Sequence, residues 1–335
     1  MKSVLIRADG NEKAGTGHLM RCLAMAEALA DKSIPTHLAY HSAPEQILER
    51  YHKFAASVHR IEAEPYGERD ARATENFARE LSCSWIMADG YEFQTRFFEA
   101  LTTNTLAVDD FGSKNVLPAT AITNQSLKAD PDWYPGHAQL LLGLQYTLLR
   151  QEFSPADSDR TAPEEITRLL ITTGGGDDQN VTTGIVDHLM AELGPGIRFD
   201  VVVGPANSHA DEIQASYADH ARVTVLRNVT NMAEVLQQAD LIVSSAGSTV
   251  WECLALGVPL VTMILAENQN DNATYLSEVR IATTAGSCRD EGFLDSLSQQ
   301  VRVSVTNPAQ AFANADKGRN LIDGKGAFRI IDRLT

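Results

Sequence analysis

Cysteine is scarce in this sequence, and its spacing excludes two common kinds of site. The four cysteines, Cys22, Cys83, Cys253 and Cys288, are scattered and form no Cys-x-x-Cys pair. This spacing argues against a structural zinc site and against a disulfide framework. We interpret them as reduced, mostly buried thiols. Since no signal peptide is evident at the N-terminus, we expect a cytoplasmic protein.

Long apolar runs and an excess of positive charge are also lacking. No stretch approaches the ~20 apolar residues of a membrane-spanning helix. Lysine and arginine number 28 against 44 aspartates and glutamates, which gives a formal charge of −16. A nucleic-acid backbone or an anionic lipid surface requires a basic face, so we expect neither as a partner. An anionic small ligand stays possible, because local N–H groups and helix ends can bind it.

Strand-like and helix-like segments alternate along the chain, and 335 residues are too many for one ordinary core. The expected strands are residues 4–8, 36–40, 57–61, 85–88, 105–108, 121–123, 167–173, 199–203, 223–226, 241–244 and 260–265. The expected helices are residues 18–30, 44–51, 69–81, 94–101, 180–193, 232–238, 249–256, 268–279 and 291–303. The pattern predicts an α/β fold of two Rossmann-like doubly wound domains facing a cleft, with ligands at the carboxyl ends of the strands.

A break in this alternation marks the expected domain boundary. Residues 153–165 hold two prolines and little that belongs in a core, so we interpret them as a linker. The predicted domains are residues 1–152 and 166–320. Residues 321–335 are expected to form a helix that packs back on the domain junction.

The most informative segment is the loop between the first expected strand and the first expected helix. Gly15, Thr16 and Gly17 let backbone N–H groups approach an anion, and the helix N-terminus adds a favourable dipole. His18 falls in the first helical turn, where the dipole disfavours imidazolium and leaves a ring able to accept a proton. Neither a dinucleotide fingerprint nor a P-loop is present. The alternative is a tight turn with close strand–helix packing.

Two further loops in the second half repeat this logic. Gly174-Gly175-Gly176-Asp177 and Ser244-Ser245-Ala246-Gly247-Ser248-Thr249 both follow strands and precede helices. Three such loops at strand ends favour a phosphate-bearing ligand. Glu252 has two interpretations. It either completes a capping box that starts at Thr249 or accepts hydrogen bonds from a ribose diol.

Acidic residues also end two strands in the first half. Asp89-Gly90-Tyr91 places a carboxylate and a phenol where proton transfer or sugar contacts are possible. Asp109-Asp110 is compatible with a divalent metal, but no third ligand has suitable spacing. Such pairs are commonly turn or cap residues, so no metal is expected.

The second half resembles the nucleotide-binding half of B-type glycosyltransferases. The segments that carry this resemblance are 226–232, 239–252, 257–259 and 266–269. The first half narrows it, and there the segments are 6–9, 15–23, 89–91 and 143–153, with 323–326 near the end. Together they resemble the UDP-sugar hydrolases of the pseudaminic acid pathway.

The resemblance implies that water cleaves UDP from UDP-2,4-diacetamido-2,4,6-trideoxy-β-L-altropyranose, with inversion and without a metal or other cofactor. It implies catalytic roles for His18, as the base, and for Tyr91. We add Asp9 as a third catalytic residue, which could orient water or sugar. The residues expected at the rest of the substrate are Gly15, Thr16, Gly17, Arg21, Asp89, Gln269 and Asn270. Those expected at UDP are Gly175, Gly176, Val229, Met232, Gly247, Ser248, Thr249 and Glu252.

Four alternatives stay open. A glycosyltransferase on the same fold would pass the sugar to an acceptor, and a related hydrolase would act in another nonulosonic-acid or polysaccharide pathway. A UDP-sugar 2-epimerase would convert the sugar, and a non-catalytic protein would only bind it. The expected partner in each case is a UDP-sugar, and we expect a monomer.

Overall fold

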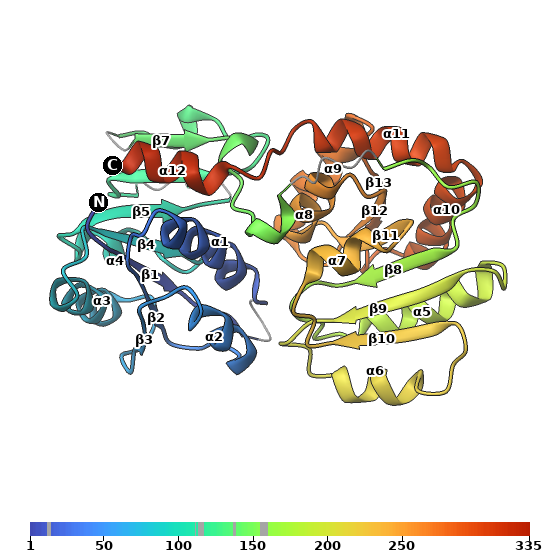
Figure 1. The fold of residues 1–335 in the computed structure, drawn as a ribbon, viewed down its shortest axis with the longest axis horizontal. Coiled ribbons are helices and arrows are strands. Elements are labelled where there is room, and N and C mark those ends of the chain that lie inside the picture. Colours follow the sequence, from blue (N-terminus) through green and yellow to red (C-terminus); the bar gives the residue numbers. More distant parts are fainter. Residues whose placement is uncertain (12–14, 111, 113–116, 137–138, 155–159) are drawn as a thin grey trace. The chain divides into compact units, whose positions relative to one another are not determined.

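The computed structural model describes residues 1–11, 15–110, 112, 117–136, 139–154 and 160–335 (Figure 1). The chain divides into two compact units. Unit 1 comprises Met1–Asn11, His18–Gln151 and Gly324–Thr335, and unit 2 comprises Glu12–Gly17 and Glu152–Asp323. Residues 12–14 of the first glycine loop and 155–159 of the predicted linker lie outside the described residues. The domain boundaries given above stay a prediction.

Unit 1 is built on a seven-stranded parallel sheet with the order β3-β2-β1-β4-β5-β6-β7. Its strands are β1 (Val4–Ala8), β2 (Thr36–Tyr40), β3 (Ser57–Arg60), β4 (Trp85–Asp89), β5 (Asn104–Val108), β6 (Ala121–Asn124) and β7 (Gln139–Leu142). The central strands β1 and β4 are buried along their whole length. Such burial is expected of a parallel sheet, because helices cover both of its faces.

Helices α1 (Gly17–Asp31), α2 (Glu45–Tyr51) and α12 (Gly326–Leu334) cover one face of this sheet, and share one core with it. Helices α3 (Glu68–Glu80) and α4 (Thr95–Glu99) contribute to the cores on the other face. Short 3₁₀ turns occur at η1 (Pro131–Trp133), η2 (Leu144–Tyr146) and η3 (Gln151–Phe153). Helix α12 comes from the end of the sequence, and Figure 1 shows it beside β7. There Gln139 Nε2 donates to the carbonyl of Arg333 over 3.3 Å.

Unit 2 has a six-stranded parallel sheet with the order β10-β9-β8-β11-β12-β13. Its strands are β8 (Arg168–Thr172), β9 (Arg198–Val203), β10 (Val223–Arg227), β11 (Leu241–Ser245), β12 (Leu260–Ile264) and β13 (Thr283–Ser287). Its helices are α5 (Val181–Glu192), α6 (Ala210–Ser216), α7 (Met232–Gln237), α8 (Thr249–Leu256), α9 (Asn270–Glu278), α10 (Phe293–Thr306) and α11 (Pro308–Arg319), with a 3₁₀ turn, η4 (Glu267–Gln269), before α9. A core between this sheet and α5, α6 and α10 includes Ile185, Ile213 and Leu297.

Both sheets reverse their strand order at one point, between β1 and β4 in unit 1 and between β8 and β11 in unit 2. Loops leave the carboxyl ends of two such strands in opposite directions, and ligands of doubly wound sheets bind at this switch point. The predicted site residues at the ends of β1, β4, β8 and β11 therefore lie where such sheets bind ligands. The expectation of two doubly wound α/β units is confirmed.

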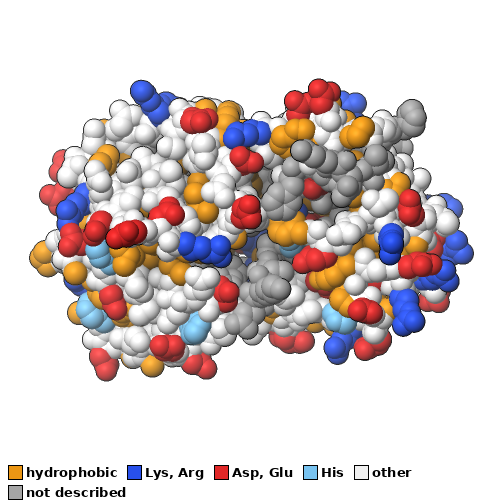
Figure 2. Space-filling view, turned by 180° about the vertical axis from the view of Figure 1, so that it is seen from behind, with side chains coloured by type: hydrophobic (Ala, Val, Ile, Leu, Met, Phe, Trp, Pro, Cys, Tyr) orange, Lys and Arg blue, Asp and Glu red, His pale blue; other side chains and the backbone are white. Residues whose placement is uncertain are grey.

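On the face shown in Figure 2, acidic and basic side chains lie among one another. Within the described ranges, no helix combines the length and the apolar character needed to cross a bilayer.

Candidate active site

A polar cluster at the switch point of unit 1 joins the start of α1 to the end of β4. His18 Nδ1 lies 2.7 Å from Asp89 Oδ1. Arg21 donates to the same carboxylate, from Nε to Oδ2 over 2.5 Å and from Nη2 to Oδ1 over 2.6 Å. His18 and Arg21 are three residues apart on α1, so both side chains project from the same helix face. The sequence spacing thus brings a base and a cation to one acid.

Asp89 is ionised in this setting. Its burial alone would raise its pKa, but the charge of Arg21, followed by His18 and their hydrogen bonds, outweighs burial. The pKa of Asp89 therefore lies well below its ordinary value. An ionised carboxylate only accepts hydrogen bonds, so Nδ1 of His18 is its donor and carries the proton. The lone pair of the neutral ring is then on Nε2, where a proton can be taken up.

Tyr91 places an aromatic ring against this histidine. The two rings meet edge to face, with centroids 4.4 Å apart and planes at 79°. Tyr91 is 43% exposed, whereas His18 is only 6% exposed. An accessible phenol therefore lies against a nearly buried imidazole.

The neighbouring aspartates after β5 have different partners. Asp110 accepts two hydrogen bonds from Arg21 Nη1, over 2.8 and 2.9 Å. Asp109 instead accepts from the hydroxyl of Tyr134 over 2.7 Å and from the N–H of Gly112 over 3.0 Å. Sequence reasoning weighed this pair only as a metal site or a turn. The missed signal was Arg21, which can join acidic ends of two adjacent strands.

Asp9, predicted to be catalytic, has partners typical of a structural residue. Its Oδ1 accepts from the backbone N–H groups of His41, over 2.6 Å, and Ser42, over 3.0 Å. Its other oxygen forms a 2.7 Å ion pair with Arg7, which also donates twice to Asp70 on α3. These contacts tie the loop after β1 to the loop after β2.

The first glycine loop has the backbone its residues suggest. Gly15 has a φ of +72°, a left-handed conformation that glycine adopts without strain. Thr16 is buried, and Gly17 opens α1. The predicted phosphate-facing role of these three residues stays a prediction.

In unit 2, the Gly174–Gly176 loop is followed by a helix start that is already satisfied. Asp177 accepts the N–H groups of Val181 and Thr182, each over 2.9 Å, and the hydroxyl of Thr182 over 2.6 Å. This carboxylate occupies the place an anion would take at the start of α5. Gly175 and Gly176 stay predicted UDP contacts. The N-terminus of α5 gives no support to that prediction, because Asp177 already binds its N–H groups.

Gly204, which sequence reasoning missed, holds this glycine loop in place. A Cβ on Gly204 would lie 2.2 Å from the carbonyl of Gly174 and 2.5 Å from that of Gly175. The N–H of Ala206 donates to the carbonyl of Gly175 over 2.9 Å. The Gly-Pro pair after β9 was the available signal, since glycine at a strand end often permits close backbone approach.

The start of α8 differs from that of α5. Its cap residue is Ser248, which makes no side-chain capping hydrogen bond, and Thr249 is already the first helical residue. The capping box interpretation, with Thr249 as the cap, is therefore wrong, because Glu252 lies four rather than three residues after the cap. A helix start without a side-chain cap suits an anionic group.

Gln269 is directed at this same loop. Its Oε1 accepts the N–H of Leu265 over 2.9 Å, which orients the amide. Its Nε2 then lies 3.7 Å from the position a Cβ would occupy on Gly247. Asn270, by contrast, donates from Nδ2 to the carbonyl of Glu267 over 2.8 Å and is committed to its own turn.

Two of the predicted UDP contacts, Val229 and Met232, lie after β10. Met232 is the first residue of α7, and the cap Asn231 accepts the N–H of Glu234 over 3.1 Å. Val229 lies in the loop before it, after Asn228, whose φ is +53°. The structure thus brings Val229 and Met232 to one strand–helix connection.

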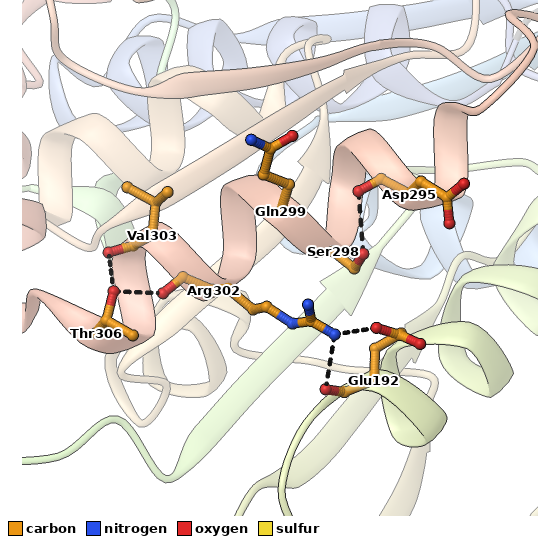
Figure 3. A pocket seen from close by; sticks show the side chains of 7 residues that line it. All are labelled: Glu192, Asp295, Ser298, Gln299, Arg302, Val303 and Thr306. Carbon is orange, nitrogen blue, oxygen red and sulfur yellow. Dashed lines mark hydrogen bonds and ion pairs between the residues drawn. The ribbon is translucent and has the colours of Figure 1, made fainter.

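A surface hollow of about 430 Å³ lies elsewhere on unit 2, along α10 and the end of α5 (Figure 3). Arg302 in it is paired with Glu192, and the hydroxyls of Ser298 and Thr306 donate to carbonyls of their own helix. None of the predicted site residues lines it. Among the residues that the structure describes, no three His, Cys, Asp or Glu side chains converge as metal ligands do.

Residues 169–330 match the model of the Glycosyltransferase family 28 C-terminal domain. An uncharacterized protein of Methanocaldococcus jannaschii is 23% identical over 356 residues, or 99% of this chain and 66% of that protein. The chain thus spans slightly less than two thirds of that relative. The spore coat polysaccharide biosynthesis protein SpsG of Bacillus subtilis is 21% identical over 334 residues, or 97% of this chain and 95% of that one. The UDP-2,4-diacetamido-2,4,6-trideoxy-beta-L-altropyranose hydrolase of Campylobacter jejuni is 22% identical over 281 residues, or 82% and 96%.

Solved structures agree over nearly the whole length. The Acinetobacter baumannii MurG structure matches with a TM-score of 0.66 at 18% identity and covers 100% of this chain and 99% of its own. The spinosyn rhamnosyltransferase SpnG complexed with thymidine diphosphate matches with a TM-score of 0.68 at 14% identity, over 100% of both chains. The chain therefore has the glycosyltransferase B fold, and its residues 169–330 match the C-terminal domain of glycosyltransferase family 28.

Proposed function

We propose that this protein is a UDP-sugar hydrolase in which His18 is the general base. The observation that carries the proposal is the 2.7 Å contact between His18 Nδ1 and Asp89 Oδ1 at the switch point of unit 1. Support comes from the altropyranose hydrolase of Campylobacter jejuni, whose match extends over 82% of this chain and so includes residues outside the family 28 region.

The chemistry follows from the tautomer of His18. Asp89 holds the proton on Nδ1, so Nε2 accepts a proton from water as the water oxygen bonds to the anomeric carbon. The bond between that carbon and the diphosphate oxygen breaks, and UDP leaves with the electron pair. The proton on His18 then passes to solvent. UDP is a good leaving group at neutral pH, so a strong acid is not required.

Unit 2 would hold the UDP. The start of α8, with Gly247, Ser248 and Thr249, offers backbone N–H groups and hydroxyls to the diphosphate. Gln269 adds an amide donor directed toward Gly247. Glu252 would accept hydrogen bonds from the ribose hydroxyls. Val229 would contact uracil through its backbone.

Tyr91 and Asp9 receive different assignments. Tyr91, exposed and in ring contact with His18, would orient water or sugar. Asp9 would act by fixing the loops after β1 and β2 rather than by transferring a proton, because its oxygens already bind Arg7 and two backbone N–H groups. Arg21 would likewise act through Asp89.

The proposed substrate is UDP-2,4-diacetamido-2,4,6-trideoxy-β-L-altropyranose, and the proposed pathway is that of pseudaminic acid. A second candidate is a hydrolase for another UDP-sugar of polysaccharide synthesis, which the match to SpsG over 97% of the chain favours. A transferase on the same fold is the third, favoured by the match to the family 28 domain.

The test is product analysis by NMR with purified protein, the UDP-altropyranose, a chelator and no acceptor. We expect equal amounts of UDP and free sugar, with the first-formed anomer inverted. UDP-N-acetylglucosamine serves as the matched nucleotide-sugar control. No release in the presence of normal UDP binding would overturn the substrate assignment. Release that begins only when an acceptor is added would show a transferase.

A further inference from the structure

The guanidinium of Arg21 is buried between two carboxylates on adjacent strand ends. Nε and Nη2 bind Asp89, and Nη1 binds Asp110. Nη2 also lies 3.3 Å from His18 Nδ1. Burial alone would lower the pKa of Arg21, but the charges of Asp110 and Asp89 raise it, so the cation is permanent. We propose that Arg21 and Asp110 are positioning residues for the His18–Asp89 pair. Arg21 keeps Asp89 ionised, which fixes the tautomer of His18, but it opposes a positive charge on His18. Asp110 favours that positive charge.

Asp89 cannot hold this tautomer unaided. A fully buried carboxylate without a cation tends to take up a proton. A protonated Asp89 would become a donor to His18 Nδ1, and the proton of the neutral ring would then sit on Nε2. His18 would thereby lose the lone pair that the proposed reaction needs.

The donors around Asp89 prevent this change. A carboxylate has about four lone-pair sites. Oδ1 accepts from His18 Nδ1 and Arg21 Nη2, and Oδ2 accepts from Arg21 Nε and, over 3.4 Å, from the thiol of Cys22. Burial raises the pKa of Cys22, which keeps the thiol protonated as a donor. All four sites are filled, so a proton on Asp89 would have to displace a donor.

Asp110 sets the net charge of the cluster. With a neutral His18, Arg21 contributes one positive charge against two carboxylates, so the cluster carries −1. When His18 takes a proton from water, the sum becomes zero. Asp110 thus favours the proton transfer, whereas Arg21 opposes it through its proximity to the ring. The dipole of the α1 N-terminus also opposes it.

Asp110 is itself held by its surroundings. Its neighbour Asp109 is fixed by the hydroxyl of Tyr134, which accepts from Asn124 Nδ2 over 2.7 Å. Asp109 is therefore anchored to Tyr134, which follows η1, and through it to β6. Among the described residues of unit 1, groups that contact His18 or its partners are Arg21 and Cys22 on α1, Asp89 and Tyr91 at β4 and Asp110 after β5. On α2, the hydroxyl of Tyr51 donates to the carbonyl of Leu19, the residue after His18.

The experiment compares Arg21→Gln and Asp110→Asn, and it rests on the proposed function for one of its two readouts. The first readout is the acid limb of the kcat–pH profile with the UDP-sugar. We expect the limb to move by about one pH unit to higher pH in Arg21→Gln and toward lower pH in Asp110→Asn. A purely structural role would lower kcat in both variants without shifting their limbs oppositely.

The second readout needs no substrate. The His18 ring, assigned by comparison with His18→Gln, is titrated by NMR in the folded protein, and its midpoint should move as the limb does. Opposite movements without hydrolysis would keep this inference and overturn the proposed function. Movements in the same direction, or none, would overturn the inference even in an active hydrolase.

Two controls keep the result interpretable. Arg21→Lys retains the charge but not the planar fork, so kcat should fall while the limb stays near its wild-type position. Asp200→Asn removes a carboxylate of unit 2 that binds Arg168 over 2.5 Å, and it should move neither readout. Asp110 is partly exposed, so Asp110→Asn tests the inference even where Arg21→Gln does not fold.

Discussion

The switch points of the two units are built from opposite kinds of residue. In unit 1 the strand ends carry buried ionic groups, with Arg21 between Asp89 and Asp110. In unit 2 the corresponding ends of β8 and β11 carry glycine and serine, at Gly174 and Ser245. Fixed charges orient a proton acceptor, whereas small residues let a ligand reach the backbone. Under the proposed function, the chemistry would lie in unit 1 and nucleotide binding in unit 2. The first three predictions below each act on one side of this comparison, and the last acts on neither.

The largest expected effect is that of His18→Gln. Removal of a general base typically costs 10²- to 10⁴-fold, and we expect a loss of kcat of about 10³-fold. UDP affinity, measured by calorimetry, should stay within about twofold of wild type, because unit 2 is unchanged. Turnover that survives this substitution would remove His18 from the mechanism.

Asp89→Asn should follow, with a loss of kcat of about 10²-fold. The amide keeps the shape of the side chain but presents N–H donors to groups that need an acceptor, and the His18 tautomer is no longer fixed. Thermal unfolding followed against pH supplies a second measurement. The depressed pKa of Asp89 contributes stability that is present above its unfolded value, about 3.9, and is lost as pH falls below it. The wild-type advantage in Tm should therefore shrink in acid.

Ser248→Asp tests the contrast between α5 and α8 within unit 2. A carboxylate at this cap would do for α8 what Asp177 does for α5 and would repel the diphosphate. UDP affinity should fall about tenfold. In the same variant, thermal unfolding should show equal or slightly greater stability. Unchanged affinity would place the diphosphate elsewhere. Ser216→Asp, at the end of α6, is the matched surface control.

The smallest effect concerns a residue outside both switch points. The carboxylate of Glu75 on α3 accepts from the hydroxyl and N–H of Thr102, from Thr103 and from Arg79. Burial would raise its pKa, but these hydrogen bonds lower it to about 2. Its contribution to stability is present above its unfolded pKa, about 4.3, and is lost as pH falls from there toward 2. Glu75→Gln should lower Tm at pH 7 but not at pH 2, and kcat should not change. Glu68 is exposed on the same helix, so Glu68→Gln should leave both Tm and kcat unchanged.

Much of the fold followed from local pattern. Strand 4–8 is apolar except for Arg7, and helix 249–256 ends at Gly257, whose φ is +63°. The strand Thr283–Ser287 was missed because it consists of small and polar residues, most of them only half-buried, so it shows no apolar period. Helix α11 was missed for a similar reason, since few of its residues are apolar and buried.

The part of the candidate site that could be predicted consists of residues whose local sequence context indicates their role. His18 after a glycine loop and Asp89 at a strand end were both singled out, and the structure places them in contact. The link through Arg21 to Asp110 depends on the register of β4 beside β5, which no local pattern encodes. Likewise, no pattern around Asp9 shows that it binds backbone N–H groups after β2, and its catalytic role stays a prediction.

Helix α12 has a consequence for the order in which the chain becomes structured during synthesis. Ala327, Ile330 and Ile331 fill part of the same core as α1, yet the ribosome makes them after all of unit 2. Apart from Glu12–Gly17, unit 2 is one stretch of the chain, Glu152–Asp323. Because this stretch is made before α12, it can fold while unit 1 still exposes an apolar face. A nascent chain held before residue 326 would display that face to chaperones, and release would cover it.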